Sequence, residues 1–149
     1  MNVMITGYGR MGREIETVLI NRGHTVSSRV DKGGYGDFTD VNLEILKDVD
    51  VVIEFSLPDT FIDNIKLYAA AGVPAIIGTT GWEDQFDSIK QIIIDNKSSM
   101  LYGSNFSIGA HIFFDLVSRA SSLINATPDY DIMMLEYHHK MKKDSPSGT

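Results

Sequence analysis

Residues 3–12 read Val-Met-Ile-Thr-Gly-Tyr-Gly-Arg-Met-Gly, and this stretch decides the fold. The apolar run at its start is typical of a buried strand. Three glycines follow in the spacing GxGxxG, and apolar residues at helical spacing from Arg10 to Asn21 predict a helix behind them. These glycines are Gly7, Gly9 and Gly12. The chain is therefore predicted to open with a strand, a tight turn and a helix.

An acidic residue, Asp31, stands at the end of the next predicted strand, residues 24–30, about 20 residues beyond the glycines. In this context each glycine has a physical role. Gly7 permits the tight turn, Gly9 lets backbone N–H groups approach a pyrophosphate, and Gly12 lets the helix pack closely. The pattern indicates a dinucleotide site, and the alternatives are a βα turn without a ligand and, for Asp31, a solvated loop residue.

Strands and helices continue to alternate beyond Asp31, with Pro at the start of one helix and Gly just after its end. Because parallel strands need crossover helices, this alternation predicts a parallel sheet. The predicted fold class is α/β, a Rossmann-type doubly wound parallel sheet followed by the start of a second α+β substrate-binding domain. The further strands are expected at residues 50–55, 73–77 and 100–102, and the further helices at residues 58–71 and 82–96.

The pattern changes after Asn105, and we predict a dinucleotide-binding domain over residues 1–105. Residues 106–149 are predicted to form the first part of a substrate and catalytic domain. A long helix with a broad apolar stripe is expected over residues 108–126, and a strand over residues 130–137. One new helix and strand would leave an open sheet edge, so a truncated second domain is expected.

Composition excludes several classes of protein. The 149 residues contain no cysteine, which excludes disulfides and a thiolate nucleophile, and carry a net charge of -7, which argues against nucleic-acid binding. No apolar run is long enough to cross a membrane, and the N-terminus lacks the features of an export signal. We therefore expect a cytoplasmic protein with neither nucleic acid nor membrane as a partner.

The expected cofactor is NADH or NADPH. The Asp31 carboxylate would accept hydrogen bonds from the ribose hydroxyls, which favours NADH, whereas the adjacent Lys32 could pair with the 2′-phosphate of NADPH. Two loops that follow predicted strands, residues 55–58 and 78–81, could line the same cofactor. Ordinary turn and capping chemistry is the alternative for both loops.

Residues 136–149 gather imidazoles, ammonium groups and a hydroxyl-rich turn in a short stretch. Lys and His side chains there could hold and protonate an anionic substrate, while Ser147, Gly148 and Thr149 could donate hydrogen bonds to a carboxylate. A zinc site is the less favoured alternative, because His138 and His139 would point to opposite sides of a strand. A solvated basic tail is the other alternative.

The chain resembles the dihydrodipicolinate reductase family, from Val3 to Thr149. The resemblance rests on residues 7–13, 78–81, 105–109 and, above all, on residues 136–149, which read Glu-Tyr-His-His-Lys-Met-Lys-Lys-Asp-Ser-Pro-Ser-Gly-Thr. It implies a reductase of diaminopimelate and lysine biosynthesis that transfers hydride from a nicotinamide to a cyclic dicarboxylate substrate. It also implies a homotetramer for the full-length protein. Members of the family continue well beyond the Pro-Ser-Gly-Thr turn, residues 146–149.

The resemblance also implies a set of site residues. His138 and Lys142 would be catalytic, as acid/base residue and proton donor, and His139, Gly148 and Thr149 would hold substrate carboxylates. No metal is expected. Another Rossmann-type dehydrogenase of amino-acid metabolism and a non-catalytic dinucleotide-binding module remain the alternatives. The dinucleotide contacts implied are Gly7, Tyr8, Gly9, Arg10, Met11, Gly12, Asp31, Gly78, Thr79, Thr80, Ser104, Asn105, Phe106 and Ser107.

Overall fold

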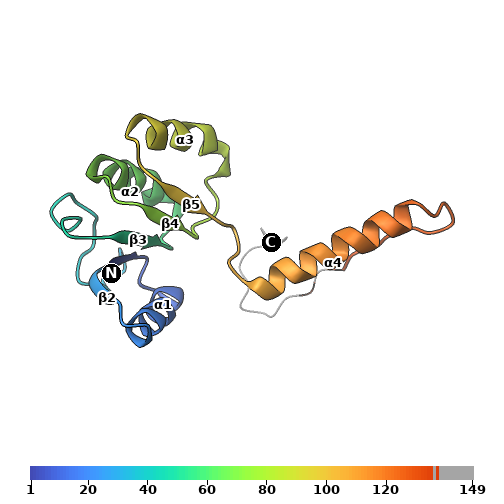
Figure 1. Ribbon diagram of the computed structural model, residues 1–149, viewed down its shortest axis with the longest axis horizontal. Helices are drawn as coiled ribbons and strands as arrows, with labels where there is room; N and C mark the ends of the chain where they lie inside the picture. Colours follow the sequence, from blue (N-terminus) through green and yellow to red (C-terminus); the bar gives the residue numbers. More distant parts are fainter. Residues whose placement is uncertain (136, 138–149) are drawn as a thin grey trace. The chain divides into compact units, whose positions relative to one another are not determined.

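The computed structural model describes residues 1–135 and 137. The chain divides into two compact units, Met1–Gly103 and Ser104–Thr149 (Figure 1). The first unit contains a parallel sheet with helices on both of its faces.

The sheet of the first unit has five strands in the order β2-β1-β3-β4-β5, and every pair of neighbours is parallel. The predicted α/β fold of Rossmann type is therefore confirmed for this unit. Strand order reverses between β1 and β3, because the chain leaves β1 toward one edge and later returns to its other side. The strands are β1 Asn2–Thr6, β2 Thr25–Val30, β3 Val51–Glu54, β4 Ala75–Ile77 and β5 Met100–Tyr102.

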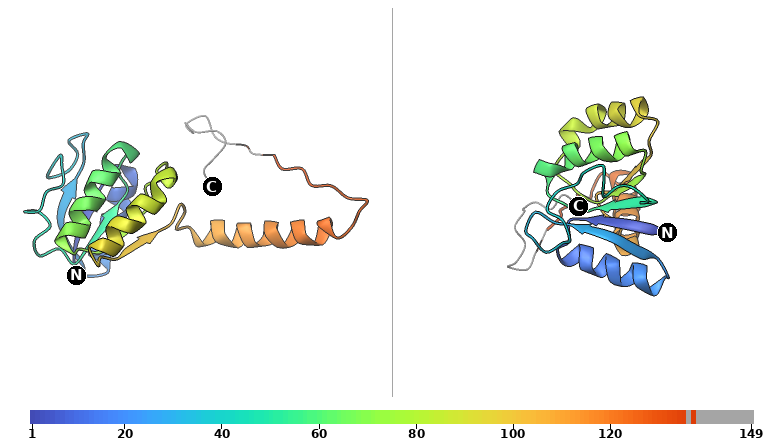
Figure 2. Two further views of the ribbon diagram at one scale, coloured as in Figure 1. Left: turned by 90° about the horizontal axis from the view of Figure 1, so that it is seen from above. Right: turned by 90° about the vertical axis from the view of Figure 1, so that its left-hand side faces the viewer.

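Helices cover both faces of this sheet. Helix α1 (Arg10–Asn21) lies on one face, and helices α2 (Pro58–Ala71) and α3 (Phe86–Asp95) lie side by side on the other, as both views in Figure 2 show. Helix α2 has its predicted bounds: Pro58 occupies its first turn and Gly72 ends it with a φ of 68°. The left-handed backbone of Gly72 ends α2, and the chain then turns toward β4.

The predicted helix over residues 82–96 is shorter than expected. A 3-10 turn, Glu83–Gln85, precedes α3, and Trp82 lies outside both. The Trp82 indole N–H donates to the carbonyl of Thr79 at 2.7 Å, and the ring is buried. Trp82 thus anchors the loop after β4 rather than a helical turn.

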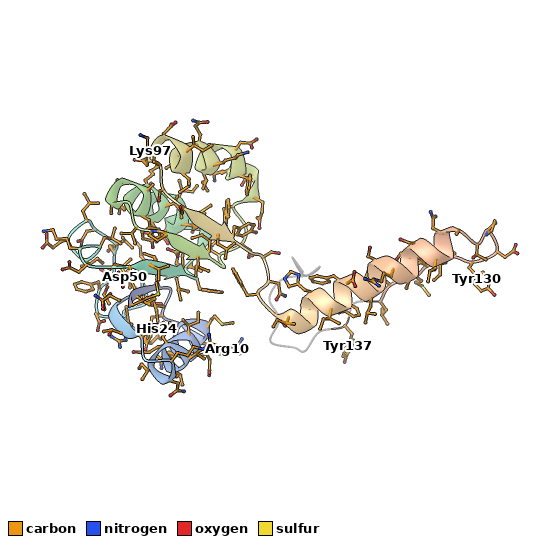
Figure 3. All side chains as sticks on the ribbon, viewed as in Figure 1. Arg10, His24, Asp50, Lys97, Tyr130 and Tyr137 are labelled. Carbon is orange, nitrogen blue, oxygen red and sulfur yellow. The ribbon has the colours of Figure 1, made fainter. Side chains whose placement is uncertain are left out.

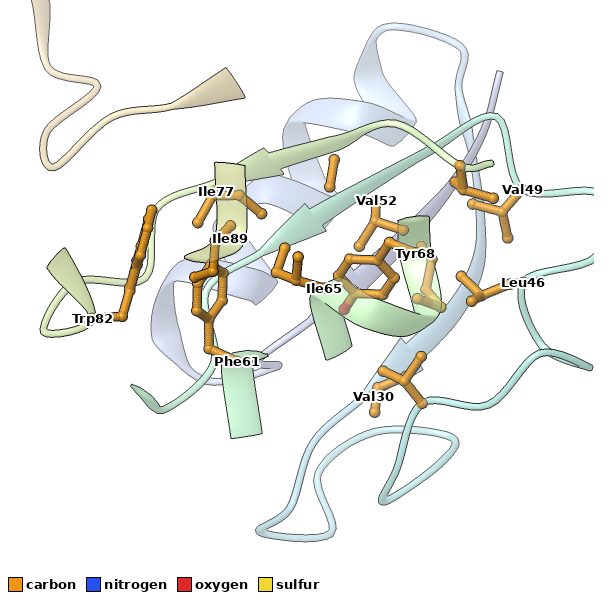
Figure 4. Packing of buried hydrophobic residues seen from close by; sticks show 14 residues of the cluster. Val30, Leu46, Val49, Val52, Phe61, Ile65, Tyr68, Ile77, Trp82 and Ile89 are labelled. Atoms are coloured by element: carbon orange, nitrogen blue, oxygen red, sulfur yellow. The ribbon is translucent and has the colours of Figure 1, made fainter. Parts of the chain in front are cut away.

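The hydrophobic core lies between the sheet and helices α2 and α3 (Figure 4). Phe61 and Trp82 pack at one end with ring centroids 4.7 Å apart, and Leu46 and Val49 lie at the other end. Ile65 of α2 is completely buried between them. This packing holds α2 against the sheet and so determines where the loop that precedes α2 lies.

Among the described residues of the second unit, helix α4 (Ile108–Asn125) is the regular element. The expected apolar stripe is present, but Ile112, Phe113 and Leu116 are exposed. The expected strand over residues 130–137 is wrong for the described part, because residues 130–135 and 137 form none. A strand needs a neighbour to complete its backbone hydrogen bonds, and no described segment pairs with these residues. No described helix is long and apolar enough to cross a membrane.

Replacing Ile65 with Ala tests the core. The substitution removes buried methyl groups and leaves a cavity, so we expect a loss of about 2–5 kcal/mol in the free energy of unfolding. Urea denaturation followed by the fluorescence of the single tryptophan, Trp82, measures it. Lys66→Ala is the matched control on the exposed side of α2 and should stay within about 0.5 kcal/mol of the parent chain. Equal losses in both variants would contradict this core.

Candidate functional site

A cleft of about 470 Å³ lies at the carboxyl ends of β1, β2 and β3, where strand order reverses. Ligands of doubly wound sheets bind at this kind of position. The cleft is lined by Thr6, Gly7, Gly9, Arg10, Met11, Val30, Asp31, Lys32, Gly33, Tyr35, Thr39, Asp40, Val41, Phe55, Ser56, Leu57, Thr60 and Asn64. Its walls therefore come from the loops after three strands and from the start of α2.

The turn after β1 requires glycine at two positions. Gly7 has a φ of +88°, and a Cβ there would lie 2.3 Å from the carbonyl oxygen of Phe55. A Cβ on Gly12 would lie 2.5 Å from the carbonyl oxygen of Gly7. The tight turn at Gly7 and the close packing at Gly12 agree with the roles expected from the sequence. Together they bring the N-terminus of α1 to the wall of the cleft.

The N-terminus of α1 is suited to an anion. Its first backbone N–H groups lack acceptors within the helix, and none of the described side chains caps them. The first turn carries no acid, and a Cβ on Gly9 would meet nothing within 4 Å. Free N–H groups, a helix dipole and open space are what a pyrophosphate needs. The residues of the cleft therefore fit a dinucleotide.

Asp31 connects the end of β2 to the glycine turn. Its carboxylate accepts hydrogen bonds from the backbone N–H of Tyr8 at 2.9 Å and from that of Gly33 at 2.8 Å. The neighbouring Lys32 pairs with Asp40 at 2.9 Å, and both side chains are exposed. The Lys32 ammonium holds the pKa of Asp40 below its ordinary value. Asp31 and Lys32, the two residues expected to discriminate between NADH and NADPH, thus both line the cleft.

A charged cluster supports this wall from behind. Arg29 of β2 pairs with Glu16 of α1 and with Asp37, and the Tyr8 hydroxyl donates to Glu16. The hydrogen bond from Arg29 lowers the pKa of Glu16, and the same bond raises the pKa of Arg29. The cluster ties α1, β2 and the glycine turn together beside the cleft.

The opposite wall follows β3, and a buried carboxyl group organises it. Glu54 is fully buried and accepts hydrogen bonds from the backbone N–H of Ser56 at 3.0 Å, the Tyr68 hydroxyl at 2.5 Å and the Asn64 amide at 3.2 Å. Burial raises the pKa of Glu54 above its ordinary value. The Tyr68 hydroxyl also shares a hydrogen bond of 2.9 Å with Thr6.

The loop after β4, residues 78–81, lies behind this wall. The Thr79 hydroxyl donates to the carbonyl of Ser56 at 3.2 Å. Glu83 accepts from the Gly81 N–H at 2.9 Å and from the Tyr102 hydroxyl at 2.7 Å. Burial, followed by the hydrogen bond to Glu83, raises the pKa of Tyr102 to about 12. The loop after β4 is thereby fixed to β5 and to the loop after β3.

The structure brings together part of the expected cofactor site. Gly7, Gly9, Arg10, Met11, Asp31 and Lys32 line the cleft, and Arg10 opens α1 (Figure 3). Tyr8, Gly12, Gly78, Thr79 and Thr80 are not among the lining residues. Sequence reasoning missed several members of the lining, because no local motif marks them. These are Thr6, Val30, Gly33, Tyr35, Thr39, Asp40, Val41, Thr60 and Asn64.

The remaining expected residues belong to the second unit. Ser107 is the N-cap of α4 and accepts a hydrogen bond from the N–H of Ala110 at 3.3 Å, and the Asn105 side chain accepts from the Ser107 N–H at 2.8 Å. Ser104 and Phe106 lie in the same segment, which begins this unit. His138, His139, Lys142, Ser147, Gly148 and Thr149 lie outside the described residues.

The parallel sheet, its switch point and the glycine turn define the class as a Rossmann-type dinucleotide-binding protein. Comparison with models of protein families identifies the family within this class. Residues 1–106 match the model of the N-terminal part of dihydrodipicolinate reductase, and residues 109–149 match that of its C-terminal part. The chain belongs to the dihydrodipicolinate reductase family, as its resemblance had implied.

Curated relatives named 4-hydroxy-tetrahydrodipicolinate reductase agree with this assignment. The chain is 36% identical to that of Christiangramia forsetii over 151 residues and 37% identical to that of Natronomonas pharaonis over 156 residues. Each alignment covers 100% of this chain, but 60% and 61% of those relatives. The chain thus spans about three fifths of the length of the curated relatives that it matches.

Solved structures show likeness in fold. A putative homoserine dehydrogenase from Archaeoglobus fulgidus matches with a TM-score of 0.54 and 16% identity, over 68% of this chain and 42% of that one. Aspartate dehydrogenase from Thermotoga maritima matches with a TM-score of 0.53 and 16% identity, over 75% of this chain and 49% of that one. At these identities the likeness concerns the fold alone.

Replacing Gly12 with Ala tests the close approach in the glycine turn. Helix propensity alone would favour Ala by about 1 kcal/mol. The contact with the carbonyl of Gly7 reverses this sign, and we expect a loss of about 1–3 kcal/mol in the free energy of unfolding. Denaturation followed by tryptophan fluorescence measures the change, with Glu14→Ala on the exposed side of α1 as the control. A Gly12→Ala chain more stable than the parent would refute the packing described.

Proposed function

We propose that this protein reduces 4-hydroxy-tetrahydrodipicolinate to tetrahydrodipicolinate with NADH or NADPH, in the biosynthesis of diaminopimelate and lysine. The observation that carries the proposal is the match of both parts of the chain to dihydrodipicolinate reductase. Relatives that carry the name of this activity align over the whole chain. The cleft at the switch point of the sheet supplies a site whose shape and chemistry agree with it.

The cleft supports a nicotinamide dinucleotide as the cofactor. The bound cofactor would supply the hydride that the reduction consumes. The N-terminus of α1 would hold the pyrophosphate through backbone N–H groups, because no described side chain competes for them. Asp31 would accept hydrogen bonds from the adenosine ribose, and Lys32 would pair with a 2′-phosphate where one is present.

The substrate is a cyclic dicarboxylate, and loss of water from its 4-hydroxyl carbon gives the unsaturated ring that is reduced. Reduction of that ring adds one hydride and one proton. We assign the proton to Lys142 or His138, and the binding of the carboxylates to His139, Ser147, Gly148 and Thr149. These residues lie outside the described part of the chain, so the assignment rests on the family's motif in residues 136–149.

The family also suggests the setting in which the reaction takes place. We propose a cytoplasmic enzyme that assembles as a homotetramer, with no nucleic acid or membrane as a partner. The net charge of -7 supports the exclusion of nucleic acid, since binding its phosphates needs a surplus of Lys and Arg.

A coupled assay tests the reaction. Dihydrodipicolinate synthase generates the substrate, and oxidation of NADH or NADPH is followed by absorbance in a preparation whose intact mass has been measured. We expect oxidation that depends on the substrate. Lys142→Ala should lower the rate by about 100-fold or more, because it removes a general acid.

Lys143→Ala is the control for that variant, since it removes an ammonium group from the adjacent position. Its rate should stay within about two-fold of the parent, because the family's motif assigns no role to Lys143. A Lys142→Ala rate equal to that of the control would remove Lys142 from the mechanism. Absence of any oxidation that depends on the substrate, in a preparation whose intact mass corresponds to the full length of the curated relatives, would disprove the proposed function.

Lys32→Ala tests the choice of cofactor. If Lys32 pairs with the 2′-phosphate, its loss should raise the Kd of NADPH by up to about five-fold, which is the upper end for an exposed charge pair. The Kd of NADH should hardly change. Titration calorimetry measures both constants, and Lys47→Ala, which breaks an exposed pair with Glu44 outside the cleft, is the control. Equal weakening of both cofactors would contradict this role of Lys32.

A further inference from the structure

Glu54 is a buried carboxyl group that the proposed reaction does not use. It ends β3, next to Thr6 of β1 in the sheet register, and its side chain is fully enclosed. Its three hydrogen-bond donors are uncharged: the Ser56 N–H, the Tyr68 hydroxyl and the Asn64 amide. Burying a carboxyl group among uncharged partners is costly in free energy. If Glu54 only filled the core, an apolar side chain would make the fold more stable.

One of these hydrogen bonds fixes the peptide between Phe55 and Ser56. The glycine turn rests on this peptide, since a Cβ on Gly7 would lie 2.3 Å from the Phe55 carbonyl oxygen and 2.6 Å from the Ser56 nitrogen. The Phe55 N–H donates to the carbonyl of Thr6 at 2.7 Å, which holds the preceding peptide, between Glu54 and Phe55, to β1. Movement of the Phe55–Ser56 peptide would therefore displace the turn at Gly7.

The other two hydrogen bonds reach the remaining parts of the cleft. Asn64 lines the cleft from α2, and the Glu54 carboxyl holds its amide. Tyr68 stands behind the lining and links Glu54 to Thr6, which lines the cleft at the end of β1. The loop after β4 joins the same network, because Thr79 donates to the carbonyl of Ser56. One carboxyl group therefore connects β1, α2 and the loops after β3 and β4.

We propose that Glu54 is a positioning residue that preorganises the cleft for the dinucleotide, through the Phe55–Ser56 peptide and through Tyr68. This inference rests on the proposed function, in which the cleft binds a nicotinamide dinucleotide. Groups that are already in place before the ligand arrives lower the entropic cost of binding. Glu54 contributes to affinity in this way without lining the cleft itself.

Glu54→Gln is the decisive variant. Its side chain has the same size, but its single carbonyl oxygen can serve either the Ser56 N–H or the pair formed by Asn64 and Tyr68, and not both. We expect the Kd of NADH, measured by titration calorimetry, to rise about ten-fold. Near-UV circular dichroism of Trp82 and urea denaturation show in parallel that the variant is folded.

Val49→Ala separates positioning from general destabilisation. Val49 belongs to the same core but precedes β3, at the opposite end of the strand from the cleft, and does not line it (Figure 4). The Kd of NADH should stay within about two-fold of the parent despite the loss of stability. Tyr68→Phe is a second test, because it removes a hydroxyl of the network that does not line the cleft and should also weaken NADH binding.

Weaker NADH binding by Glu54→Gln and Tyr68→Phe, with Val49→Ala unchanged, supports the proposal. Unchanged binding by Glu54→Gln overturns it, and so does a loss of affinity that simply follows stability in all three variants. If Glu54→Gln does not fold, Tyr68→Phe decides in the same way. A parent protein that binds neither NADH nor NADPH contradicts the proposed function itself, which is a different result from normal binding that the variants leave unchanged.

Discussion

The backbone turn at Gly7 lies directly on the peptide between Phe55 and Ser56, and much of the site depends on this contact. It brings the ends of β1 and β3 together at the point where strand order reverses. Only a residue without a Cβ can make the approach, and only a positive φ can then turn the chain toward α1. The N-terminus of α1 consequently opens on the cleft, where its N–H groups can meet an anion.

The two walls of the cleft differ in the exposure and pairing of their charged side chains. On the side of β2, exposed or partly exposed charges are paired: Arg29 with Glu16, and Lys32 with Asp40. On the side of β3, the carboxyl of Glu54 is buried among neutral donors. Exposed pairs contribute little to stability and can exchange partners with a ligand, whereas a buried network resists rearrangement. The first wall is suited to recognition and the second to rigidity.

The described part of the second unit shows that local sequence signals can form a helix whose apolar side chains stay exposed. Ser107 caps α4 correctly, and the helix extends over 18 residues. Its apolar side chains Ile112, Phe113 and Leu116 nevertheless remain exposed. Local capping and apolar periodicity are thus sufficient to predict a helix, but they do not supply its partner.

The sequence alone determined the elements that depend on neighbouring residues. The glycine turn, the bounds of α2 between Pro58 and Gly72, and the short strand β5 were all predicted, because dihedral preferences and periodicity act within a few residues. Tertiary structure decided what depends on distant contacts. Asn64 and Thr60 line the cleft because α2 packs where it does, Trp82 leaves its predicted helix to fill the core, and residues 130–135 form no strand without a neighbour. Such outcomes depend on surfaces that meet only after folding, and no local pattern encodes them.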